Sequence, residues 1–461
     1  MDDRFNLKNR AYTVEIIGYA AGGEGVARLE DGRVAFVRGG ARGDVCEISI
    51  TSESARSCRG EIVSLLSPSG HRVKPDCEAY PMCGGCDFRH ITYEEELWAK
   101  LRRLNDALAR IGGVSARAEE ILSSGRRDAY RNKAVFHTAI VNGKTIVGFF
   151  RAGSREVCPV TRCLLLKEEL NRALLDLWRD PPEAGTEITL RTGAGRVAKS
   201  VIKRSGERAR SADARAPERA ATRSDRDFVA RSYAGGIERS GERAASRYSG
   251  CIVETLDGIT FRMSGSSFFQ VNTDAALILY RQARAYAGLS ADETLVDLYC
   301  GVGSLTLFVG RDARRAIGVE NNPYAIADAR ANAKIYARAS AKAFAGTNEK
   351  DNEIDNARAN AGTNGLGFTK FEFALADVAA WETDIKPDCV IVDPPRQGLS
   401  SGAVSKIQEL SPSRLVYISC DPATLARDIN RLDKYEARKV CAVDMFPGTA
   451  NVESCVLMVK K

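Results

Sequence analysis

The chain has 461 residues, which at about 150 residues per domain corresponds to roughly three domains. Its 67 Lys and Arg against 60 Asp and Glu give a formal net charge of +7, and the 44% hydrophobic content is that of a globular protein. This balance excludes wholesale disorder, collagen and a coiled-coil rod. No run approaches the roughly 20 apolar residues of a membrane span, and the polar start lacks an apolar signal core. We expect a monomer in the cytoplasm.

Most of the excess positive charge lies in one segment. Residues 199–247 contain 13 Lys or Arg and 7 Asp or Glu, with few aliphatic or aromatic side chains. Such a composition cannot bury enough apolar area to offset the entropy of ordering. We therefore expect a disordered insert over residues 200–248, with an electrostatic arm for RNA phosphates as the alternative. A second low-complexity segment covers residues 341–367 and carries no recognisable chemistry.

Residues 12–66 predict a small β-barrel. Short alternating runs are separated by glycine turns, and Asp31-Gly32 is a hairpin signal. Five short strands in so few residues favour a closed barrel, because closure leaves no free sheet edge. The nine Lys or Arg and ten Asp or Glu of residues 1–66 give no support for nucleic-acid binding from bulk charge. The order of these features nevertheless resembles the TRAM domain, an RNA-binding barrel of some RNA-modifying enzymes.

A group of cysteines follows the predicted barrel. Cys77, Cys83 and Cys86 surround Gly84-Gly85, and glycines allow the backbone to fold tightly enough for sulfurs to converge. Zinc is possible, but a structural zinc site usually takes two ligand pairs, and the sequence has no second CxxC. Three clustered cysteines and one distant cysteine favour a cubane iron–sulfur cluster. Cys158 and Cys163 are the two candidates for the fourth ligand.

A helix and a basic stretch come next. Residues 94–111 have apolar residues at helical spacing, a glutamate-rich first turn and two glycines after the last turn. Nine Lys or Arg and four acids lie between Lys100 and Lys133. This stretch is either a solvated basic face or a contact surface for the RNA backbone.

From Thr294 onward, strands alternate with helices, which predicts a doubly wound α/β fold. An apolar strand leads into the turn Gly301-Val302-Gly303, and the next strand ends at Glu320, where an acid can bind both hydroxyls of a ribose. The turn lacks the third glycine of the GxGxxG pattern, which favours S-adenosylmethionine over NAD. Arg396 follows Pro394-Pro395 where an aromatic residue is usual for amine methylation, which argues against an exocyclic amine substrate.

The last two strands supply the candidate reactive groups. Cys420 follows an apolar strand and precedes a helix, a position that can lower the pKa of a thiol and produce a nucleophilic thiolate. Glu453 stands where the final strand begins. In an open α/β sheet the carboxyl ends of the parallel strands line one crevice, so we expect both side chains near it.

Taken together, the motifs resemble the RNA 5-methyluridine methyltransferase family, the uracil-C5 enzymes of ribosomal and transfer RNA. The resemblance covers nearly all of the chain except the two inserts. The motifs that carry it are GFFRAGSREVCPV, SFFQVN, DLYCGVGSLTLFV, IVDPPRQGL, YISCDPATLARDI and NVESCVLM. The TRAM-like barrel combined with the clustered cysteines resembles the 23S ribosomal RNA branch of this family.

The resemblance implies a role for each matching residue. Cys420 would attack C6 of the uracil, and Glu453 would remove the C5 proton after methyl transfer. S-adenosylmethionine would contact Gln270, Tyr299, Ser304, Glu320, Asp377 and Asp393. The resemblance selects Cys163 beside Cys77, Cys83 and Cys86 as ligands of a [4Fe–4S] cluster. Asn451 replaces a usual histidine, and asparagine is commoner at positions 304 and 377.

These observations predict three domains: a TRAM-like barrel at 1–67, a central α+β domain with the cluster at 68–262, and a Rossmann-like S-adenosylmethionine methyltransferase domain at 263–461. One alternative is a transfer RNA uridine C5-methyltransferase. A second is a non-catalytic, cluster-bearing RNA-binding sensor with a vestigial cofactor pocket. The sensor predicts a missing nucleophile or base, whereas the sequence has both Cys420 and Glu453.

Overall fold

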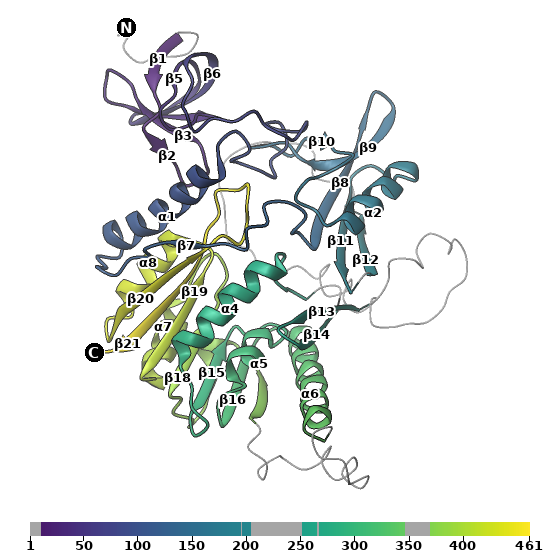
Figure 1. Ribbon diagram of the computed structural model, residues 1–461, viewed down its shortest axis with the longest axis vertical. Helices are drawn as coiled ribbons and strands as arrows, with labels where there is room; N and C mark the ends of the chain where they lie inside the picture. The colour runs from purple at the N-terminus through teal and green to yellow at the C-terminus, as the bar shows by residue number, and fades with distance from the viewer. Residues whose placement is uncertain (1–10, 195, 204–250, 265–266, 346–368) are drawn as a thin grey trace.

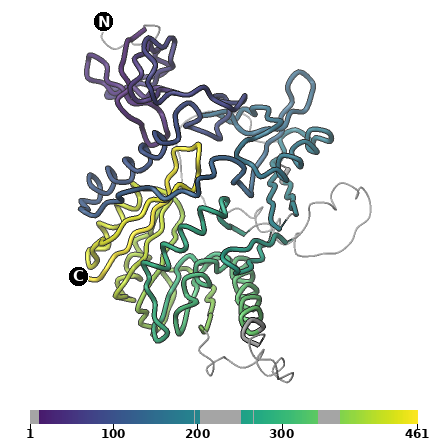
Figure 2. The backbone as a smooth tube through the Cα atoms, viewed as in Figure 1, coloured from purple at the N-terminus to yellow at the C-terminus, as the bar shows by residue number. Residues whose placement is uncertain are grey.

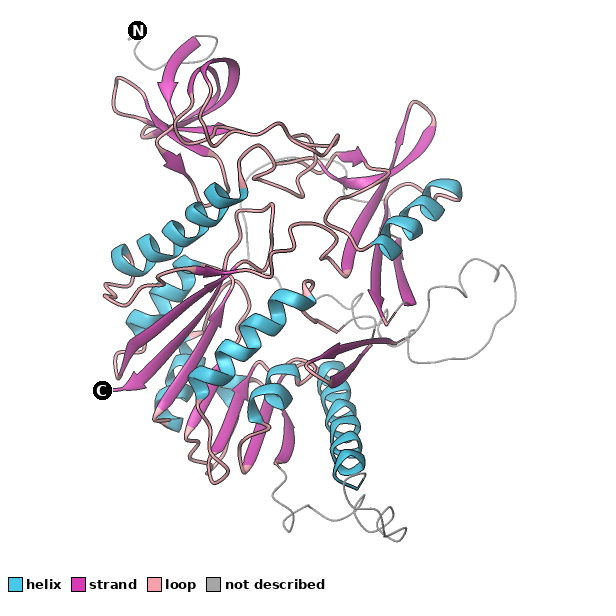
Figure 3. Cartoon of the chain, viewed as in Figure 1, coloured by secondary structure: helices cyan, strands magenta, loops and turns pink. Residues whose placement is uncertain are grey.

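The computed structural model describes residues 11–194, 196–203, 251–264, 267–345 and 369–461. The elements form three groups: a β-barrel near the N-terminus, a five-stranded sheet with one helix, and a large sheet flanked by helices (Figures 1 and 3). Within the described ranges, no helix is long and apolar enough to cross a membrane.

The barrel is a six-stranded sheet with the order β1-β5-β6-β4-β3-β2. Just beyond β1, the amide of Ile17 donates to the carbonyl of Val26 at 2.8 Å, which brings the first strand against the third. Alternating residues such as Ile16, Ala35 and Ile48 fill the interior. The strand count is one more than the five expected. The strands are β1 (Ala11–Glu15), β2 (Gly18–Tyr19), β3 (Gly25–Arg28), β4 (Val34–Arg38), β5 (Val45–Glu53) and β6 (Ser57–Ser67).

The second group is the sheet β10-β9-β8-β11-β12, with α2 packed on one face. Its elements are β8 (Lys133–Val141), β9 (Lys144–Phe150), β10 (Val157–Pro159), α2 (Glu168–Arg179), β11 (Thr186–Gly193) and β12 (Arg196–Lys203).

The structure corrects the limits of both predicted inserts. Residues 200–203 pair with residues 186–189 as the end of β12, because the run around Val201 is apolar enough to extend the sheet. Residues 341–345 are likewise the last turn of helix α6. The expectation of disorder for the rest of each insert concerns residues 204–248 and 346–367, which lie outside the described residues.

The third group is the eight-stranded sheet β17-β16-β15-β18-β19-β21-β20-β7. Its first five strands are parallel, and β21 then runs antiparallel to both β19 and β20. Buried aliphatic residues on both faces explain the near-continuous apolar runs of the sequence. The strands are β15 (Thr294–Leu298), β16 (Arg315–Glu320), β17 (Lys370–Leu375), β18 (Cys389–Val392), β19 (Arg414–Ser419), β20 (Tyr435–Val443) and β21 (Glu453–Lys460).

Helices cover both faces of this sheet (Figure 3). They are α4 (Thr273–Ala287), α5 (Ser304–Gly310), α6 (Pro323–Ala345), the short 3-10 helix η3 (Val378–Ala380), α7 (Ser401–Leu410) and α8 (Pro422–Arg431). A hairpin of β13 (Ile252–Leu256) and β14 (Ile259–Met263) packs with α4 and α5 in the same apolar core.

An earlier part of the chain completes this sheet. The strand β7 (Ile121–Leu122) pairs with Ala442 and Val443 of β20. The helix α1 (Tyr93–Arg110) packs its apolar residues, among them Leu104 and Leu108, into the core that α8 shares. Residues 93–122 therefore fold with the C-terminal sheet, although they lie within the range expected for the central domain.

A buried group of charges fixes α1 to the loop that follows β20. We call Glu96, Lys100 and Asp444 the α1 ion cluster. The ammonium of Lys100 lies 2.6 Å from a carboxylate oxygen of each acid, and all three side chains are fully buried. The same Glu96 oxygen accepts the amide of Gly448 at 2.7 Å. Figure 2 shows the yellow C-terminal loop reaching up beside the helix that follows the barrel.

Replacing Lys100 by Met should lower the free energy of unfolding by about 3–5 kcal/mol, because two buried carboxylates lose the ammonium that they share. The matched control is Lys406→Met on α7, whose partner Glu409 has a largely exposed side chain. That control should cost less than about 1 kcal/mol. Denaturant unfolding at pH 7 measures both values. A similar small loss in the two variants would contradict a stabilising role for the α1 ion cluster.

Candidate active site

The candidate active site lies at the carboxyl ends of the parallel strands, as the sequence predicts. Asp393 follows β18, Cys420 follows β19, and Glu453 begins the antiparallel strand β21 beside it. Ser419 of β19 pairs with Ser454 of β21. Cys420 is the residue after Ser419, and Glu453 is the residue before Ser454, so both stand at the same end of this strand pair. The fold thus brings the predicted nucleophile and the predicted base to neighbouring strand ends.

The thiol of Cys420 is held in its neutral form. Burial raises its pKa to about 11, and the neighbouring carboxyl groups of Glu453 and Asp393 add to the rise, while Arg396 opposes it. The sequence-based expectation of a lowered pKa is therefore wrong for the ligand-free protein. The helix start that was expected to lower it is already capped, because Asp421 accepts the amide of Thr424 at 2.8 Å.

Two carboxyl groups share the interior of the site. Burial raises the pKa of Asp393 to about 7, and burial together with Asp393 raises the pKa of Glu453 well above its ordinary value. Like charges this close cannot both ionise freely, so the pair titrates as a unit. The pair retains a proton near neutral pH, and a deprotonated Glu453 is a stronger base than a solvated glutamate.

Arg396 brings a positive charge to this site, a role that the sequence motifs did not predict. Its charge lowers the pKa of both Cys420 and Glu453. Its guanidinium donates to the side-chain oxygen of Asn451 at 3.5 Å, the residue at which the family resemblance implies a histidine. The place of Arg396 at a strand end, directly after Asp393-Pro394-Pro395, could have identified it in the sequence.

A glycine turn forms the neighbouring half of the crevice. Tyr299, Gly301 and Gly303 all have positive φ angles, of 68°, 54° and 77°. Glu320 at the end of β16 accepts the amides of Gly301 at 3.2 Å and Asn322 at 2.9 Å. The predicted ribose-binding carboxylate therefore does lie against the predicted turn, where it also holds the backbone of that turn.

The other predicted cofactor residues lie around this turn with varied roles. The hydroxyl of Ser304 is 2.8 Å from that of Tyr280, and both are buried. The carboxylate of Asp377 accepts the amide of Ala379 at 2.8 Å and caps η3, and its charge contributes to raising the pKa of Tyr299 to about 12. Gln270 is buried just before α4.

Asp297 is a buried carboxyl group that the sequence analysis did not single out. One oxygen accepts the hydroxyl of Thr306 at 2.6 Å, and the other has no hydrogen-bond partner among the described residues. Burial raises its pKa to about 7, and Asp393 and Glu320 contribute. Its position on β15, two residues before Tyr299, could have identified it in the sequence. A crevice this rich in carboxyl groups suits a ligand with a positive charge.

The clustered cysteines surround a separate cavity of about 300 Å³ next to the five-stranded sheet. The four predicted ligands line it, together with Arg131, whereas Cys158 does not line it and is buried in β10. Within the described residues, no three His, Cys, Asp or Glu side chains converge as a single metal ion would require. The four cysteines are Cys77, Cys83, Cys86 and Cys163.

Comparisons with known proteins identify the family of the chain. Residues 252–461 match the family described as tRNA (Uracil-5-)-methyltransferase, and residues 7–63 match the TRAM domain. An uncharacterized RNA methyltransferase of Gloeobacter violaceus is 31% identical over 99% of this chain and 97% of its own length. A second, from Clostridium tetani, is 28% identical over 98% of this chain and 96% of its own length.

A solved structure shares the fold. The Pyrococcus abyssi tRNA (uracil-54, C5)-methyltransferase in complex with S-adenosyl-L-homocysteine aligns with a TM-score of 0.64 at 22% identity, over 97% of this chain and all of that one. The likeness shows the Rossmann-like fold, and the relatives described above show that the chain is an RNA methyltransferase. More narrowly, the chain belongs to the RNA uracil-5-methyltransferase family, with an N-terminal TRAM domain.

Alkylation by iodoacetamide should report the raised pKa of Cys420. In the ligand-free protein its alkylation rate should keep rising with pH toward about 11, because only the thiolate reacts. Arg396→Gln removes the opposing positive charge, so it should slow the reaction at pH 9 by about three-fold, equivalent to about half a pKa unit. Site-resolved mass spectrometry measures the rates.

The control for Arg396→Gln is Arg438→Gln, at an exposed position of β20, which should leave the rate unchanged. The exposed thiol of Cys251 serves as an internal reference in every sample. Rapid modification of Cys420 at pH 7 in the unsubstituted protein would contradict the raised pKa.

Proposed function

We propose that this protein methylates C5 of a specific uridine in RNA, with S-adenosylmethionine as methyl donor and 23S ribosomal RNA as substrate. The observation that carries the proposal is the placement of Cys420, Glu453 and Asp393 at adjoining strand ends of a methyltransferase crevice. Family membership and the carboxyl-rich crevice, which suits a cationic sulfonium, support the donor. The three domain ranges 1–67, 68–262 and 263–461, the monomer and the cytoplasmic location stay predictions.

The reaction needs one nucleophile and one base. Uracil C5 is a weak nucleophile, and addition of the Cys420 thiolate to C6 turns C5 into an enolate-type carbon that can attack a methyl group. S-adenosylmethionine supplies that methyl group as a sulfonium when it is bound. Glu453 then takes the proton from C5, and the electron pair of that C–H bond expels the thiolate from C6. The target base must leave its stack to reach the thiol.

Arg396 and Asp393 set the charges for these steps. In the empty site the Cys420 thiol is neutral, so its proton must pass to water before the thiolate attacks C6. Arg396 favours the thiolate electrostatically, and a positive charge in the crevice would do the same. Asp393 raises the proton affinity of Glu453, which favours removal of the C5 proton. The proposed contacts to the donor are Gln270, Tyr299, Ser304, Glu320, Asp377 and Asp393.

Substitution of the two catalytic residues should separate the steps. Cys420→Ala should abolish both methylation and the covalent protein–RNA adduct, because nothing else activates C5. Glu453→Gln should permit attack and methyl transfer but stall proton removal, so a denaturation-resistant adduct should accumulate. Gel electrophoresis of denatured samples with radiolabelled RNA measures the adduct. Cys441→Ala, a buried cysteine of β20, is the control and should behave like the unsubstituted protein. Normal turnover by Glu453→Gln would contradict its assigned role.

We further propose that Cys77, Cys83, Cys86 and Cys163 hold a [4Fe–4S] cluster. Four cysteines around one cavity fit a multinuclear cluster, whose sulfur ligands surround a volume and do not converge on one ion. The guanidinium of Arg131 in the same wall complements the negative charge of such a centre. The cluster has no part in the methylation chemistry described above, and the proposal gives it a structural role.

Anaerobically purified protein should be brown and contain about four irons per chain, as a cubane requires. Cys163→Ala should lose most of that iron, whereas Cys158→Ala should retain it, because Cys158 lies outside the cavity. Iron analysis and visible absorption measure the content. Zinc in place of iron would overturn the cluster, and full retention by Cys163→Ala would overturn the fourth ligand.

A transfer RNA substrate is the second candidate. It is favoured by the family matched at residues 252–461, described as tRNA (Uracil-5-)-methyltransferase, and by the name of the Pyrococcus abyssi enzyme with the same fold. The ribosomal substrate is favoured by the combination of a TRAM domain with four cysteines around one cavity. Methylation assays on transcripts of both RNAs from the source organism decide between them. We expect methyl incorporation into 23S RNA, and incorporation into transfer RNA alone would overturn this choice.

A further inference from the structure

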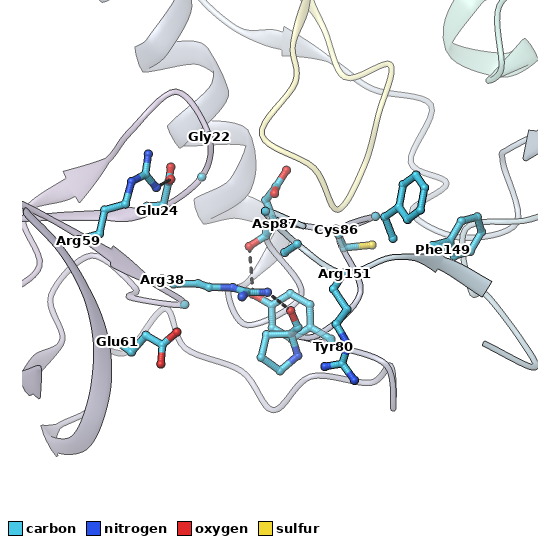
Figure 4. A pocket seen from close by; sticks show the side chains of 18 of the residues that line it. Gly22, Glu24, Arg38, Arg59, Glu61, Tyr80, Cys86, Asp87, Phe149 and Arg151 are labelled. Atoms are coloured by element: carbon cyan, nitrogen blue, oxygen red, sulfur yellow. Dashed lines mark hydrogen bonds and ion pairs between the residues drawn. The ribbon is translucent and has the colours of Figure 1, made fainter. Parts of the chain in front are cut away.

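A second, larger cavity lies between the TRAM barrel and the five-stranded sheet. Its volume is about 620 Å³, within the range of about 300–1,000 Å³ typical of pockets for small molecules. Figure 4 shows Arg59, Glu61 and Glu24 on the barrel side and Phe149 and Arg151 on the opposite side. This volume accommodates a nucleoside with its phosphate. We call it the barrel cavity.

Aromatic residues line the barrel cavity. Phe36 of β4, Tyr80 and Phe149 line it from three different segments. The rings of His137 and Phe150 also line it and are stacked, with centroids 3.7 Å apart and planes 14° apart. Glycines, including Gly39 and Gly153 with open space where a Cβ would stand, leave room beside these rings. Such walls suit a flat, unpaired nucleobase, since every base has a face that can stack.

The charges of the barrel cavity favour contact with a base over contact with phosphates. Three arginines and three acids line it, so its formal charge is balanced. Arg59 pairs with Glu24 at 2.8 Å, Arg38 donates to the carbonyl of Pro81, and Arg38 is the register partner of Glu61. A phosphate-binding groove would carry an excess of positive charge, whereas mixed donors and acceptors read base edges.

A hydrogen bond links the barrel cavity to the loop that leads to the active site. Asp87 in its wall accepts the amide of Ala450 at 2.9 Å. Ala450 precedes Glu453 by three residues, so their Cα atoms are at most about 11 Å apart. In Figure 4 the C-terminal loop passes beside Asp87 and Cys86. A base in this cavity would therefore be only a few nucleotides from a uridine at Cys420.

We propose that the barrel cavity binds one unpaired base of the RNA substrate, a few nucleotides from the target uridine, and so contributes to the choice of that uridine. This inference rests on the proposed function, because it takes RNA as the substrate. A duplex does not fit the role, because its bases are stacked on one another and cannot lie against the rings of this cavity.

Three variants test the cavity. Arg38→Gln and Arg151→Gln each remove a charged donor, and Phe150→Leu removes a stacking ring but keeps apolar volume. The matched controls are Arg28→Gln and Arg155→Gln, at exposed positions of the barrel and of the β9–β10 loop outside the cavity. Thermal melting should be nearly unchanged in all five.

The probe is a pool of single-stranded RNA dodecamers with one central 5-fluorouridine and random flanking bases. With S-adenosylmethionine present, fluorine cannot leave as a proton, so the RNA stays covalently bound. Sequencing of the trapped RNA should show one flanking position enriched about ten-fold in its preferred base, as expected for one stacked base. The cavity variants should reduce the enrichment to less than about two-fold, while adduct formation and the salt dependence of binding persist. The controls should keep the enrichment.

Retention of the full enrichment by all three cavity variants, or no enriched position in the unsubstituted protein, would overturn the inference. A second selection separates it from the proposed function. Cys420→Ala protein selects from a uridine version of the pool by binding alone, without catalysis. The first outcome to consider is that the unsubstituted protein forms no adduct with the 5-fluorouridine pool, while the binding selection still shows a base preference that depends on Arg38 and Phe150. In that case the methylation proposal fails and the cavity inference stands.

Discussion

The placement of the active site depends on the buried ion cluster of Glu96, Lys100 and Asp444. It joins a helix near residue 100 to a loop near residue 444, two parts of the chain separated by more than three hundred residues. The loop continues through Gly448, whose amide Glu96 accepts, to Glu453 at the start of β21. Isolated buried charges are costly, so these three are compatible with folding only when they meet. The loop that leads to Glu453, the proposed base, is thereby held by an interaction outside the sheet.

The same helix also contacts the side of the crevice that holds Cys420, the proposed nucleophile. Arg103 of α1 donates to the carbonyl of Ala450 at 2.9 Å and lies 3.6 Å from the carboxylate of Asp421. One residue of α1 thus touches the segment before Glu453 and the residue after Cys420. Within the crevice, the carboxyl groups of Asp297, Asp393 and Glu453 all have raised pKa values because they are buried close together. This crowding is unfavourable in the empty protein, and a cationic ligand would relieve it.

The sequence predicted what strand order and local turns determine. The nearness of Cys420 to Glu453 could be predicted from their places at strand ends. The grouping of the four cysteines around one cavity could be predicted from the tight spacing of three of them and from the family motif around Cys163. What depends on distant contacts escaped prediction. The pairing of β7 with β20 could not be predicted, because a strand of two residues is too short to show an alternating pattern of apolar residues. The rise in the pKa of Cys420 comes from its burial in the folded protein and from the carboxyl groups of Glu453 and Asp393, and no local motif reveals either cause. The electrostatic effect of Arg396 on Cys420 and Glu453 was not predicted for the same reason.

The joining of β7 to β20 also has a consequence for synthesis on the ribosome. Ile121 and its partner Ala442 are 321 positions apart. At about 5–20 residues per second, roughly 15–60 s pass between their translation. During that interval the apolar side of α1 and the short β7 have no partner from α8 or β20. The barrel can form as it emerges, but the segment that follows it must wait for nearly the whole polypeptide. Residues 93–122 therefore present an unpartnered apolar surface to premature association during that interval.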